Sequence, residues 1–338
     1  MNILILSHKF SPFIGGIEVM SQEIANYLSH SGYNIHVLTW TENKEIDSYP
    51  YKIIRNPSIL KILKEHHWAD LVFENNTNLR LSWPLLFFKK LHLNVIHGQI
   101  CRNDRSISFI DKLKLRWIHR ANKVIAVSQA MKSQVFPKAL VVHNYYRDYI
   151  FKENSNNRDE MSFVFLGRIV SVKGVDIALK TIAKLNKQNH LNCTLTVIGN
   201  GPLLEEMRNL SIELEIDHIT HFTGMLSGEN LVNVLNNNKY ILIPSTQESF
   251  GLVALEGMAC GCLPIVSNVD GLPEAVGAAG FVVVDYKNID GFYNAITFLL
   301  DNPQKEACYR SQFNKHLEKF KLDSVCQKYK EVIESIIK

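Results

Sequence analysis

The sequence predicts an α/β protein with two doubly wound parallel-sheet domains, and three observations lead to this prediction. Short apolar runs alternate along the chain with segments whose apolar residues recur at helical spacing. The apolar runs are rich in Val, Ile and Leu on both faces, which is typical of parallel strands covered by helices on both sides. The 338 residues exceed what one hydrophobic core usually supports, so two domains of roughly 150 residues each are expected.

The first half opens with a β–α–β unit. A strand at Asn2–Ser7 is followed by a loop that contains Gly15 and Gly16, and a strand at Asn34–Thr39 comes next. Between them, apolar residues recur at helical spacing, at Ile17, Met20, Ile24 and Leu28. Two strands joined through a helix are parallel, with a right-handed crossover. Further strands of this half are expected at Leu71–Phe73, Asn94–His97, Val124–Val127 and Leu140–His143.

Residues 152–161 contain no apolar periodicity and are expected to form a linker, after which the alternation resumes. We therefore expect an N-terminal domain at 1–151, a C-terminal domain at 162–318 and a C-terminal helix at 319–338, a candidate to pack back on the N-terminal domain. The second domain has expected strands at 162–166, 194–198, 219–222, 240–243, 263–267 and 281–284, and helices near 175–187, 202–215, 228–237, 252–261 and 289–300. Ligands of such sheets bind where the carboxyl ends of the strands meet, so a cleft between the domains is the expected site.

Composition and the start of the chain limit the class of protein. With 46% hydrophobic and 21% charged residues and no internal repeat, the sequence is neither disordered nor fibrous. Its first apolar run is too short for a signal peptide, and no apolar stretch approaches the roughly 20 residues that cross a bilayer. The six cysteines are scattered and form no Cys-x-x-Cys pair, which predicts a reducing cytoplasmic location without a zinc site.

The charge is distributed unevenly between the two halves. Residues 1–153 hold 20 Lys and Arg against 12 Asp and Glu, whereas residues 154–338 hold 17 against 21. A basic half beside an acidic half suggests an anionic surface or ligand near the first half, although chance surface composition explains it equally well.

Two cations follow the first strand of the second domain. Arg168 comes directly after that strand end, and Lys173 lies five residues later near the start of the next helix. An arginine fork and a lysine point charge can together hold a diphosphate. The alternative is a pair of solvated surface charges.

Residues 244–262 combine carboxylates with a glycine-led helix start. Glu248 lies in the loop after strand 240–243, and Ser249, Phe250 and Gly251 lead into a helix that carries Glu256. Its first free N–H groups, those of Leu252 and Val253, can point at an anion. Two carboxylates eight residues apart suit the recognition of sugar or ribose hydroxyls. The simpler explanation for Glu256 is a favourable interaction with the helix dipole.

The string from Glu248 to Gly261 resembles the Glu-x7-Glu signature of the family 4 retaining glycosyltransferases, whose fold is GT-B, with two Rossmann-like domains facing across a cleft. Other pieces resemble that family in the same order along nearly the whole chain. They are Gly15-Gly16, His97-Gly98, Val127-Ser128, His143-Asn144, Gly167-Arg168, Lys173-Gly174, Gly199-Asn200-Gly201-Pro202 and Pro244-Ser245. Tyr145-Tyr146 departs from the family, which usually has Gly after the His-Asn pair.

The resemblance implies transfer of a hexosyl unit from a UDP- or GDP-sugar, without a cofactor, in the synthesis of a bacterial surface polysaccharide such as O-antigen, capsule or lipopolysaccharide. It implies that Arg168 and Lys173 neutralise the leaving diphosphate, while Glu256 binds the ribose and Glu248 the donor sugar. Backbone near Gly199 and Met225 would meet the nucleotide. Gly15 and Gly16 would lie against the donor, and His97 would bond the sugar near the reacting carbon.

The catalytic chemistry is expected to be independent of metal and to retain configuration. No Asp-x-Asp pair, the usual chelate of metal-dependent transferases, occurs in the chain, so cations and a helix N-terminus would take over the role of a metal. Three functions stay open. They are a retaining hexosyltransferase, which the intact signature favours, a GT-B relative such as a phosphorylase or epimerase, and a catalytically silent nucleotide-binding subunit of a glycan-synthesis complex.

Residues 102–123 combine basic and apolar side chains. Seven of them are Lys or Arg, interleaved with Phe109, Ile110, Leu113, Trp117 and Ile118. Such a pattern suits an anionic membrane surface, which predicts a peripheral enzyme on the inner leaflet of the plasma membrane with a glycan or lipid-linked acceptor. The alternative is that the apolar residues belong to the core and the charges to a solvated face. No nucleic-acid-binding module is present.

Overall fold

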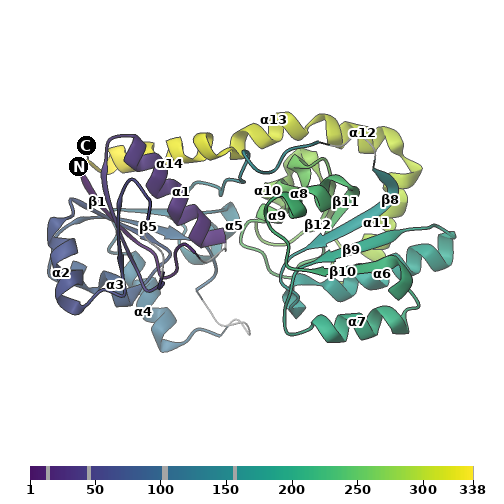
Figure 1. Ribbon diagram of the computed structural model, residues 1–338, viewed down its shortest axis with the longest axis horizontal. Helices are drawn as coiled ribbons and strands as arrows, with labels where there is room; N and C mark the ends of the chain where they lie inside the picture. Colours follow the sequence, from purple (N-terminus) through teal and green to yellow (C-terminus); the bar gives the residue numbers. More distant parts are fainter. Residues whose placement is uncertain (13–15, 44–46, 101–105, 155–157, 338) are drawn as a thin grey trace. The chain divides into compact units, whose positions relative to one another are not determined.

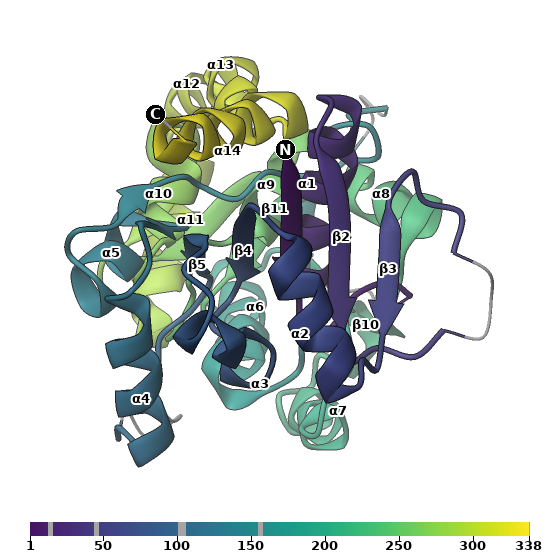
Figure 2. The ribbon, with the colours of Figure 1, turned by 90° about the vertical axis from the view of Figure 1, so that its left-hand side faces the viewer.

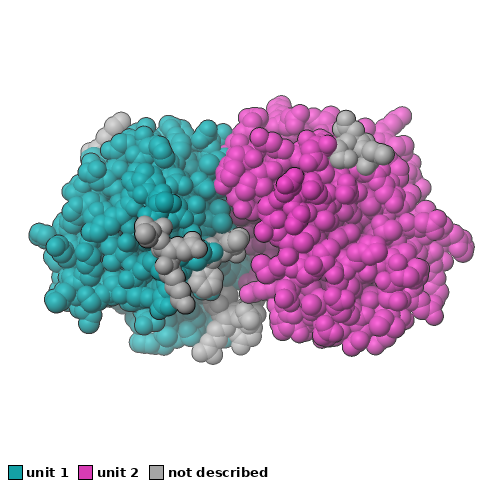
Figure 3. Space-filling model, viewed as in Figure 1, with its two compact units in different colours: residues 1–145, 322–338 teal, residues 146–321 magenta. Residues whose placement is uncertain are grey.

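The computed structural model describes residues 1–12, 16–43, 47–100, 106–154 and 158–337. It divides into two compact units, coloured separately in Figure 3. Unit 1 comprises Met1–Tyr145 together with Leu322–Lys338, and unit 2 comprises Tyr146–Lys321. Each unit contains one fully parallel sheet with helices, which confirms the expected α/β class with two doubly wound domains.

Unit 1 contains a seven-stranded sheet in the order β3-β2-β1-β4-β5-β6-β7, part of which can be followed in Figure 2. The strands are β1 (Asn2–Leu6), β2 (Asn34–Thr39), β3 (Lys52–Arg55), β4 (Leu71–Asn75), β5 (Leu91–Ile96), β6 (Lys123–Ala126) and β7 (Leu140–Val141). The central strands β1 and β4 are buried on both faces, as expected for strands in the middle of a parallel sheet.

The helices of unit 1 cover this sheet. They are α1 (Gly16–His30), α2 (Ile59–Trp68), α3 (Leu79–Ser82), α4 (Phe109–Ile118), α5 (Gln129–Val135) and α14 (Leu322–Ile337), with a 3-10 turn η1 (Trp83–Leu86). Helix α1 buries Met20, Ile24 and Leu28, as their spacing predicts. The C-terminal helix α14 lies beside α1 and buries Tyr329 against Phe73 of β4 (Figure 1).

Unit 2 contains a six-stranded sheet in the order β10-β9-β8-β11-β12-β13. Its strands are β8 (Asp159–Leu166), β9 (Thr194–Ile198), β10 (Thr220–Gly224), β11 (Asn238–Ile243), β12 (Leu263–Ser267) and β13 (Phe281–Val283). Its helices are α6 (Val175–Asn189), α7 (Leu204–Glu213), α8 (Gly228–Asn236), α9 (Leu252–Ala259), α10 (Leu272–Val276), α11 (Ile289–Asp301), α12 (Pro303–Ser311) and α13 (Phe313–Leu317). The 3-10 turns are η2 (Ser171–Lys173), η3 (Asp217–Ile219), η4 (Gly277–Ala279) and η5 (Glu318–Phe320).

The structure differs from the sequence prediction at the boundary between the units. Strand β8 begins at Asp159, inside the stretch expected to be a linker, because Asp159 continues the pairing with β11 at Asn238. The chain passes into unit 2 after Tyr145 and returns to unit 1 at Leu322, so the C-terminal helix belongs to the unit that contains residue 1.

Candidate active site

The carboxyl ends of the neighbouring strands β10, β9, β8 and β11 lie at one edge of the sheet of unit 2. Glycines let the loops that follow these strands pack closely. A Cβ atom at Gly199 would lie 1.9 Å from the carbonyl oxygen of Gly167, and one at Gly201 would lie 2.2 Å from that of Ile169. The Gly199 N–H also donates to the Gly224 carbonyl at 2.9 Å. The predicted Gly-x-Gly-Pro turn after β9 therefore packs directly against the loop after β8 and the end of β10.

Arg168 lies in the first of these loops. The backbone on either side of it is fixed, since the N–H of Gly167 donates to the Ile198 carbonyl at 3.0 Å and that of Ile169 to the Asn200 carbonyl at 2.9 Å. The Arg168 side chain is exposed, and its guanidinium has no partner among the residues that the structure describes. It is positioned on a rigid loop and free to meet an anion.

Lys173 and Glu248, which the sequence predicts as site residues from separate motifs, form an ion pair between the Lys173 ammonium and Glu248 Oε2. Their side chains are 26% and 20% exposed, so the pair is accessible at the surface of the site. The structure thus brings together a cation and a carboxylate separated by 75 positions in the chain.

Two backbone contacts hold the loops that carry this pair. The Thr246 N–H donates to the Val172 carbonyl at 2.9 Å. Gly174 has φ +71, and a Cβ atom there would lie 2.1 Å from the Pro244 carbonyl oxygen. A side chain at residue 174 would therefore push the two loops apart.

The loop after β11 is held in place by hydrogen bonds with the loop after β12. The Glu248 N–H donates to Asp270 Oδ2 at 3.1 Å, and the Gly271 N–H donates to the Glu248 carbonyl at the same distance. Sequence reasoning missed Asp270, which follows β12 at the same edge of the sheet. Its role is to fix the backbone of Glu248.

Helix α9 begins with open N–H groups, as expected. Gly251, with φ +109, precedes the helix, and a Cβ atom there would lie 2.6 Å from Leu272 Cδ2. The Ala254 N–H donates to the Gly251 carbonyl, whereas those of Leu252 and Val253 have no partner among the described residues. These two donors and the helix dipole can stabilise an anion.

The residues just before this helix differ in how they can meet a ligand. The Phe250 ring is 1% exposed and packs against Phe320, with ring centroids 5.6 Å apart. It is therefore a core side chain, and only its backbone can contact a ligand. Ser249 is partly exposed and already engaged in an interaction with the protein.

Glu256 lies on α9 with its side chain 15% exposed. Burial raises the pKa of its carboxyl group to about 7, although the positive charge of Arg147 opposes this shift. Arg147 Nη2 lies 3.9 Å from Glu256 Oε1. Sequence reasoning missed Arg147, whose position just after the start of unit 2 gives no sign that it meets a helix over 100 positions later.

Met225 follows β10 and its side chain is 74% exposed. Gly224, with φ +73 and open space around its Cβ position, turns the chain there. Residue 225 is thus exposed at the same edge of the sheet as Arg168.

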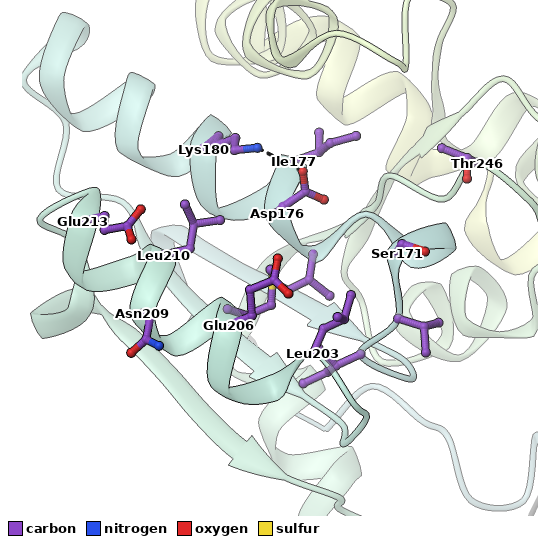
Figure 4. Close-up of a pocket in the computed structure, with 14 residues that line it drawn as sticks. Ser171, Asp176, Ile177, Lys180, Leu203, Glu206, Asn209, Leu210, Glu213 and Thr246 are labelled. Carbon is purple, nitrogen blue, oxygen red and sulfur yellow. Dashed lines mark hydrogen bonds and ion pairs between the residues drawn. The ribbon is translucent and has the colours of Figure 1, made fainter.

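A cavity of about 830 Å³ lies between the start of α6 and the length of α7, and Ser171 and Thr246 from the loops after β8 and β11 also line it (Figure 4). Three carboxylates line it against one lysine, Lys180, which is paired with Asp176. The other two carboxylates belong to Glu206 and Glu213. A diphosphate would be repelled there, so Arg168 and Lys173 remain the candidate anion site.

In unit 1, two of the predicted residues fall at the carboxyl edge of the sheet. His97 follows β5 and is 6% exposed, and its Nε2 lies 2.6 Å from Asn75 Oδ1 at the end of β4. Burial lowers the pKa of His97 to about 4, so the imidazole is neutral at physiological pH. Gly16 begins α1 and is exposed, and Gly15 lies outside the described residues.

The basic and apolar segment before β6 divides into two parts. Trp117 and Ile118 are buried in the core, whereas Phe109, Ile110 and Leu113 are 75%, 59% and 42% exposed. Arg102 and Arg105 lie outside the described residues. The core interpretation therefore holds for the end of α4 and not for its beginning.

Neither a metal cluster nor a membrane-spanning helix is present in the described part of the chain. No group of three or more His, Cys, Asp or Glu side chains among those residues is arranged to hold a metal ion. None of the helices that they form combines the length and apolar character that crossing a bilayer requires.

Comparison with known sequences gives a consistent result. A family model described as Glycosyl transferases group 1 matches residues 147–316. An uncharacterised glycosyltransferase of Methanocaldococcus jannaschii is 26% identical over 323 residues, covering 87% of this chain and 83% of that protein. A D-inositol 3-phosphate glycosyltransferase of Saccharomonospora viridis is 34% identical over 172 residues, covering 48% of this chain and 40% of that protein.

Solved structures resemble the whole chain. Anabaena HepE in complex with UDP superposes with a TM-score of 0.84 at 19% identity, covering 99% of this chain and 100% of that chain. Sucrose-phosphate synthase from Thermosynechococcus elongatus gives 0.83 at 18% identity, covering 99% of both chains. These matches confirm the expected GT-B fold of two Rossmann-like domains.

Proposed function

The chain belongs to the family of group 1 glycosyl transferases, and from this membership we propose that it transfers a hexosyl unit from a nucleotide diphosphate sugar. The acceptor in this proposal is a glycan or a lipid-linked sugar. One observation carries the proposal, namely that the loops of unit 2 hold the exposed Arg168, the Lys173–Glu248 pair and the open N-terminus of α9 at one edge of the sheet.

This arrangement suits the departure of a diphosphate. As the bond between the anomeric carbon and the phosphate oxygen breaks, its electron pair moves to the diphosphate, where negative charge accumulates. Arg168 and Lys173 offer positive charge to that group, and the free N–H groups of Leu252 and Val253 offer hydrogen bonds. Preorganised donors of this kind typically lower the barrier enough to change rates by about 10²–10³ each.

We propose that transfer retains configuration and needs no metal ion. The acceptor hydroxyl attacks the face that the diphosphate leaves, and its proton passes to the departing phosphate oxygen. The absence of an Asp-x-Asp pair from the sequence supports a role for protein cations in place of a metal. In this scheme Glu256 binds the ribose hydroxyls, Glu248 and His97 bind the donor sugar, and backbone at Met225 meets the base.

Turnover of a panel of UDP-, GDP- and ADP-sugars, with and without EDTA, tests the proposal. We expect hydrolysis or transfer with a UDP- or GDP-sugar that is unchanged by EDTA. Arg168→Ala and Lys173→Ala should each lower kcat by about 10²–10³. Lys187→Ala, an exposed lysine in the last turn of α6, is the matched control and should have no effect. Loss of activity with EDTA and recovery with Mn²⁺ would contradict the proposed role of the cations.

The alternative is a nucleotide-binding subunit without catalytic activity. Such a protein would be stabilised by UDP or GDP in a thermal shift assay, because ligand binding raises apparent stability. It would not hydrolyse any nucleotide sugar of the panel or transfer its sugar to an acceptor. The complete set of Arg168, Lys173, Glu248 and Glu256 at one edge of the sheet favours the enzyme.

We further propose a role in the synthesis of a bacterial surface glycan. Structural neighbours include WaaG, a glycosyltransferase described as involved in lipopolysaccharide biosynthesis, and HepE in complex with UDP and glucose. Other relatives are named glycogen synthase and D-inositol 3-phosphate glycosyltransferase, so the family supports several acceptors. We choose a UDP-sugar as the donor and a saccharide as the acceptor because they agree with the names of these relatives and structural neighbours.

We also propose that unit 1 meets an anionic membrane surface from the cytoplasmic side. Phe109 and Leu113 lie one helical turn apart on the exposed face of α4, together with Lys112 and Arg116. Apolar side chains flanked by cations on one helix face are typical of helices that lie in the interface of anionic bilayers. A surface of this kind would bring the enzyme to a lipid-linked acceptor.

A further inference from the structure

A continuous series of hydrogen bonds connects α1 with His97. Ser7 Oγ and Ser21 Oγ lie 2.8 Å apart, and Asn75 Nδ2 donates to Ser21 Oγ at 2.6 Å. Asn75 Oδ1 lies 2.6 Å from His97 Nε2. All four side chains are buried, and the segments that carry them meet at the carboxyl edge of the sheet.

The surroundings of Asn75 determine which way its amide group points. The Ile17 carbonyl, which can only accept, lies 3.5 Å from Asn75 Nδ2 and 2.9 Å from Ser21 Oγ. If the amide were reversed, its oxygen would face that carbonyl and compete for the single hydrogen of Ser21. The NH₂ group therefore faces α1 and the amide oxygen faces the imidazole.

This orientation determines the tautomer of His97. An amide oxygen can only accept, so the imidazole must donate from Nε2. Because burial lowers the pKa of His97 to about 4, the ring carries one proton at neutral pH, and Nδ1 is left with a lone pair. No described residue hydrogen-bonds to Nδ1. The ring therefore offers a hydrogen-bond acceptor at Nδ1 and no second donor.

We propose that Asn75 is a positioning residue that holds His97 as the Nε2–H tautomer, so that Nδ1 accepts a hydrogen bond from a hydroxyl group of the donor sugar. The hydrogen bond between Nδ1 and the sugar rests on the proposed function, whereas the assignment of the His97 tautomer does not. The ligand group that contacts Nδ1 must therefore be a hydrogen-bond donor. A sugar with a carboxylate at that place, or with no hydroxyl, would leave the acceptor unsatisfied and bind less well.

Nitrogen NMR of the ligand-free protein with ¹⁵N-labelled histidine tests the tautomer directly, with the His97 signals assigned from a His97→Gln spectrum. We expect a protonated nitrogen at the position coupled to both ring C–H protons, which is Nε2, and an unprotonated Nδ1. The spectrum should not change between pH 8 and pH 5.5. A protonated Nδ1, or a ring that titrates in that range, would overturn the proposal.

Variants separate positioning from a general loss of packing. In Asn75→Ala the two tautomers should exchange, giving averaged nitrogen shifts, and kcat/KM should fall about five- to tenfold. Asn75→Asp should restore the Nε2–H form, since its carboxylate also accepts, and should raise the pKa of His97. Asn94→Ala is the matched control, because Asn94 is equally buried on β5 and bonds Glu74 instead of His97. If Asn94→Ala changed the His97 spectrum as much as Asn75→Ala, or if Asn75→Ala left it unchanged, Asn75 would have no positioning role.

A pair of substitutions at His97 identifies the nitrogen that faces the sugar. The Asn side chain places an acceptor near Nδ1, whereas Gln places its amide near Nε2. We expect His97→Asn to keep at least tenfold more kcat/KM than His97→Gln, and the reverse order would overturn the assignment of Nδ1. If no nucleotide sugar is turned over but the ligand-free spectrum shows the Nε2–H form, the proposed function fails and the role of Asn75 in fixing the tautomer stands.

Discussion

Glu256 carries a carboxyl group whose charge changes near neutral pH, because burial raises its pKa to about 7. An ionised carboxylate accepts hydrogen bonds from both hydroxyls of a ribose, whereas the protonated group accepts them less well. We expect the affinity for a nucleotide sugar to rise about tenfold between pH 6 and pH 8, since the ionised fraction rises by that factor. Calorimetric titration against pH measures this.

A suitable ligand and a control variant are needed so that the pH dependence can be assigned to Glu256. A nucleotide sugar is the correct probe, because its diphosphate diester does not titrate in this range, unlike the terminal phosphate of UDP. Glu256→Gln should bind more weakly and with no dependence on pH. A wild-type affinity that is flat from pH 6 to pH 8 would mean that Glu256 does not bind the ribose in its ionised form.

Two buried tyrosines form a natural pair for a stability test. The Tyr240 hydroxyl donates to Glu306 Oε2 at 2.7 Å, whereas the Tyr329 hydroxyl has no hydrogen-bond partner among the described residues. An unsatisfied buried hydroxyl costs free energy, so Tyr329→Phe should stabilise unit 1 by about 1 kcal/mol. Tyr240→Phe should destabilise unit 2 by about 1–3 kcal/mol. Urea denaturation of both variants checks the opposite signs, and equal signs would mean that the two hydroxyls do not differ in hydrogen bonding.

The sequence predicts the candidate site residues that belong to motifs, and it misses the contacts that join them to distant residues. Arg168, Lys173, Glu248 and Glu256 follow from their places at strand ends and on one helix. The Lys173–Glu248 pair does not follow, because the order of strands β8 and β11 in the sheet is needed to bring the two loops together. The contacts of Arg147 with Glu256 and of Asn75 with His97 likewise depend on how the fold brings separate segments together.

At the scale of the elements, the close contact at Gly174 fixes the loops after β8 and β11. Gly174→Ala combines an unfavourable φ with a Cβ atom 2.1 Å from the Pro244 carbonyl oxygen. We expect about 2–4 kcal/mol of destabilisation and a loss of kcat larger than the loss of stability explains. Thermal unfolding together with kcat measures both.

Gly32 provides the matched control for this prediction. It also has a positive φ, of +88, but nothing lies within 4 Å of its Cβ position. Gly32→Ala should therefore cost only about 1–2 kcal/mol from the backbone conformation and leave kcat unchanged. If both variants behaved alike, the contact with Pro244 would have no part in aligning the site.

The accuracy of the element prediction follows the apolar content of each element. Strands that are buried on both faces, such as β1 and β11, are predicted within one or two residues. The prediction omits β3 and α2. Strand β3 is an edge strand with one buried residue, Ile54, and the buried positions of α2 include the polar Glu65 and His66, so neither gives a clear apolar period.

At the scale of the whole molecule, the proposed membrane surface predicts binding to vesicles. We expect co-sedimentation with vesicles that contain anionic lipid at low salt, and little with neutral lipid or at high salt, because surface charges are then screened. The double variant Phe109→Ser, Leu113→Ser should weaken binding at least tenfold, since each side chain contributes about 1.5 kcal/mol or more when buried in lipid.

An exposed apolar residue in unit 2 controls for nonspecific hydrophobic adsorption to lipid. Ile212 of α7 is 61% exposed in unit 2, and Ile212→Ser should leave vesicle binding unchanged. Equal loss in this variant, or no binding to anionic vesicles at low salt, would refute the membrane surface.

Helix α14 completes unit 1 although it comes last in the sequence. Val325, Cys326, Tyr329 and Ile333 are all buried there, in a unit whose other residues end at Tyr145. During synthesis on the ribosome, all of unit 2 therefore emerges before unit 1 receives its final helix. Unit 1 therefore cannot complete its core before residues 322–337 have emerged, and until then its apolar surface beside α1 is available to chaperones.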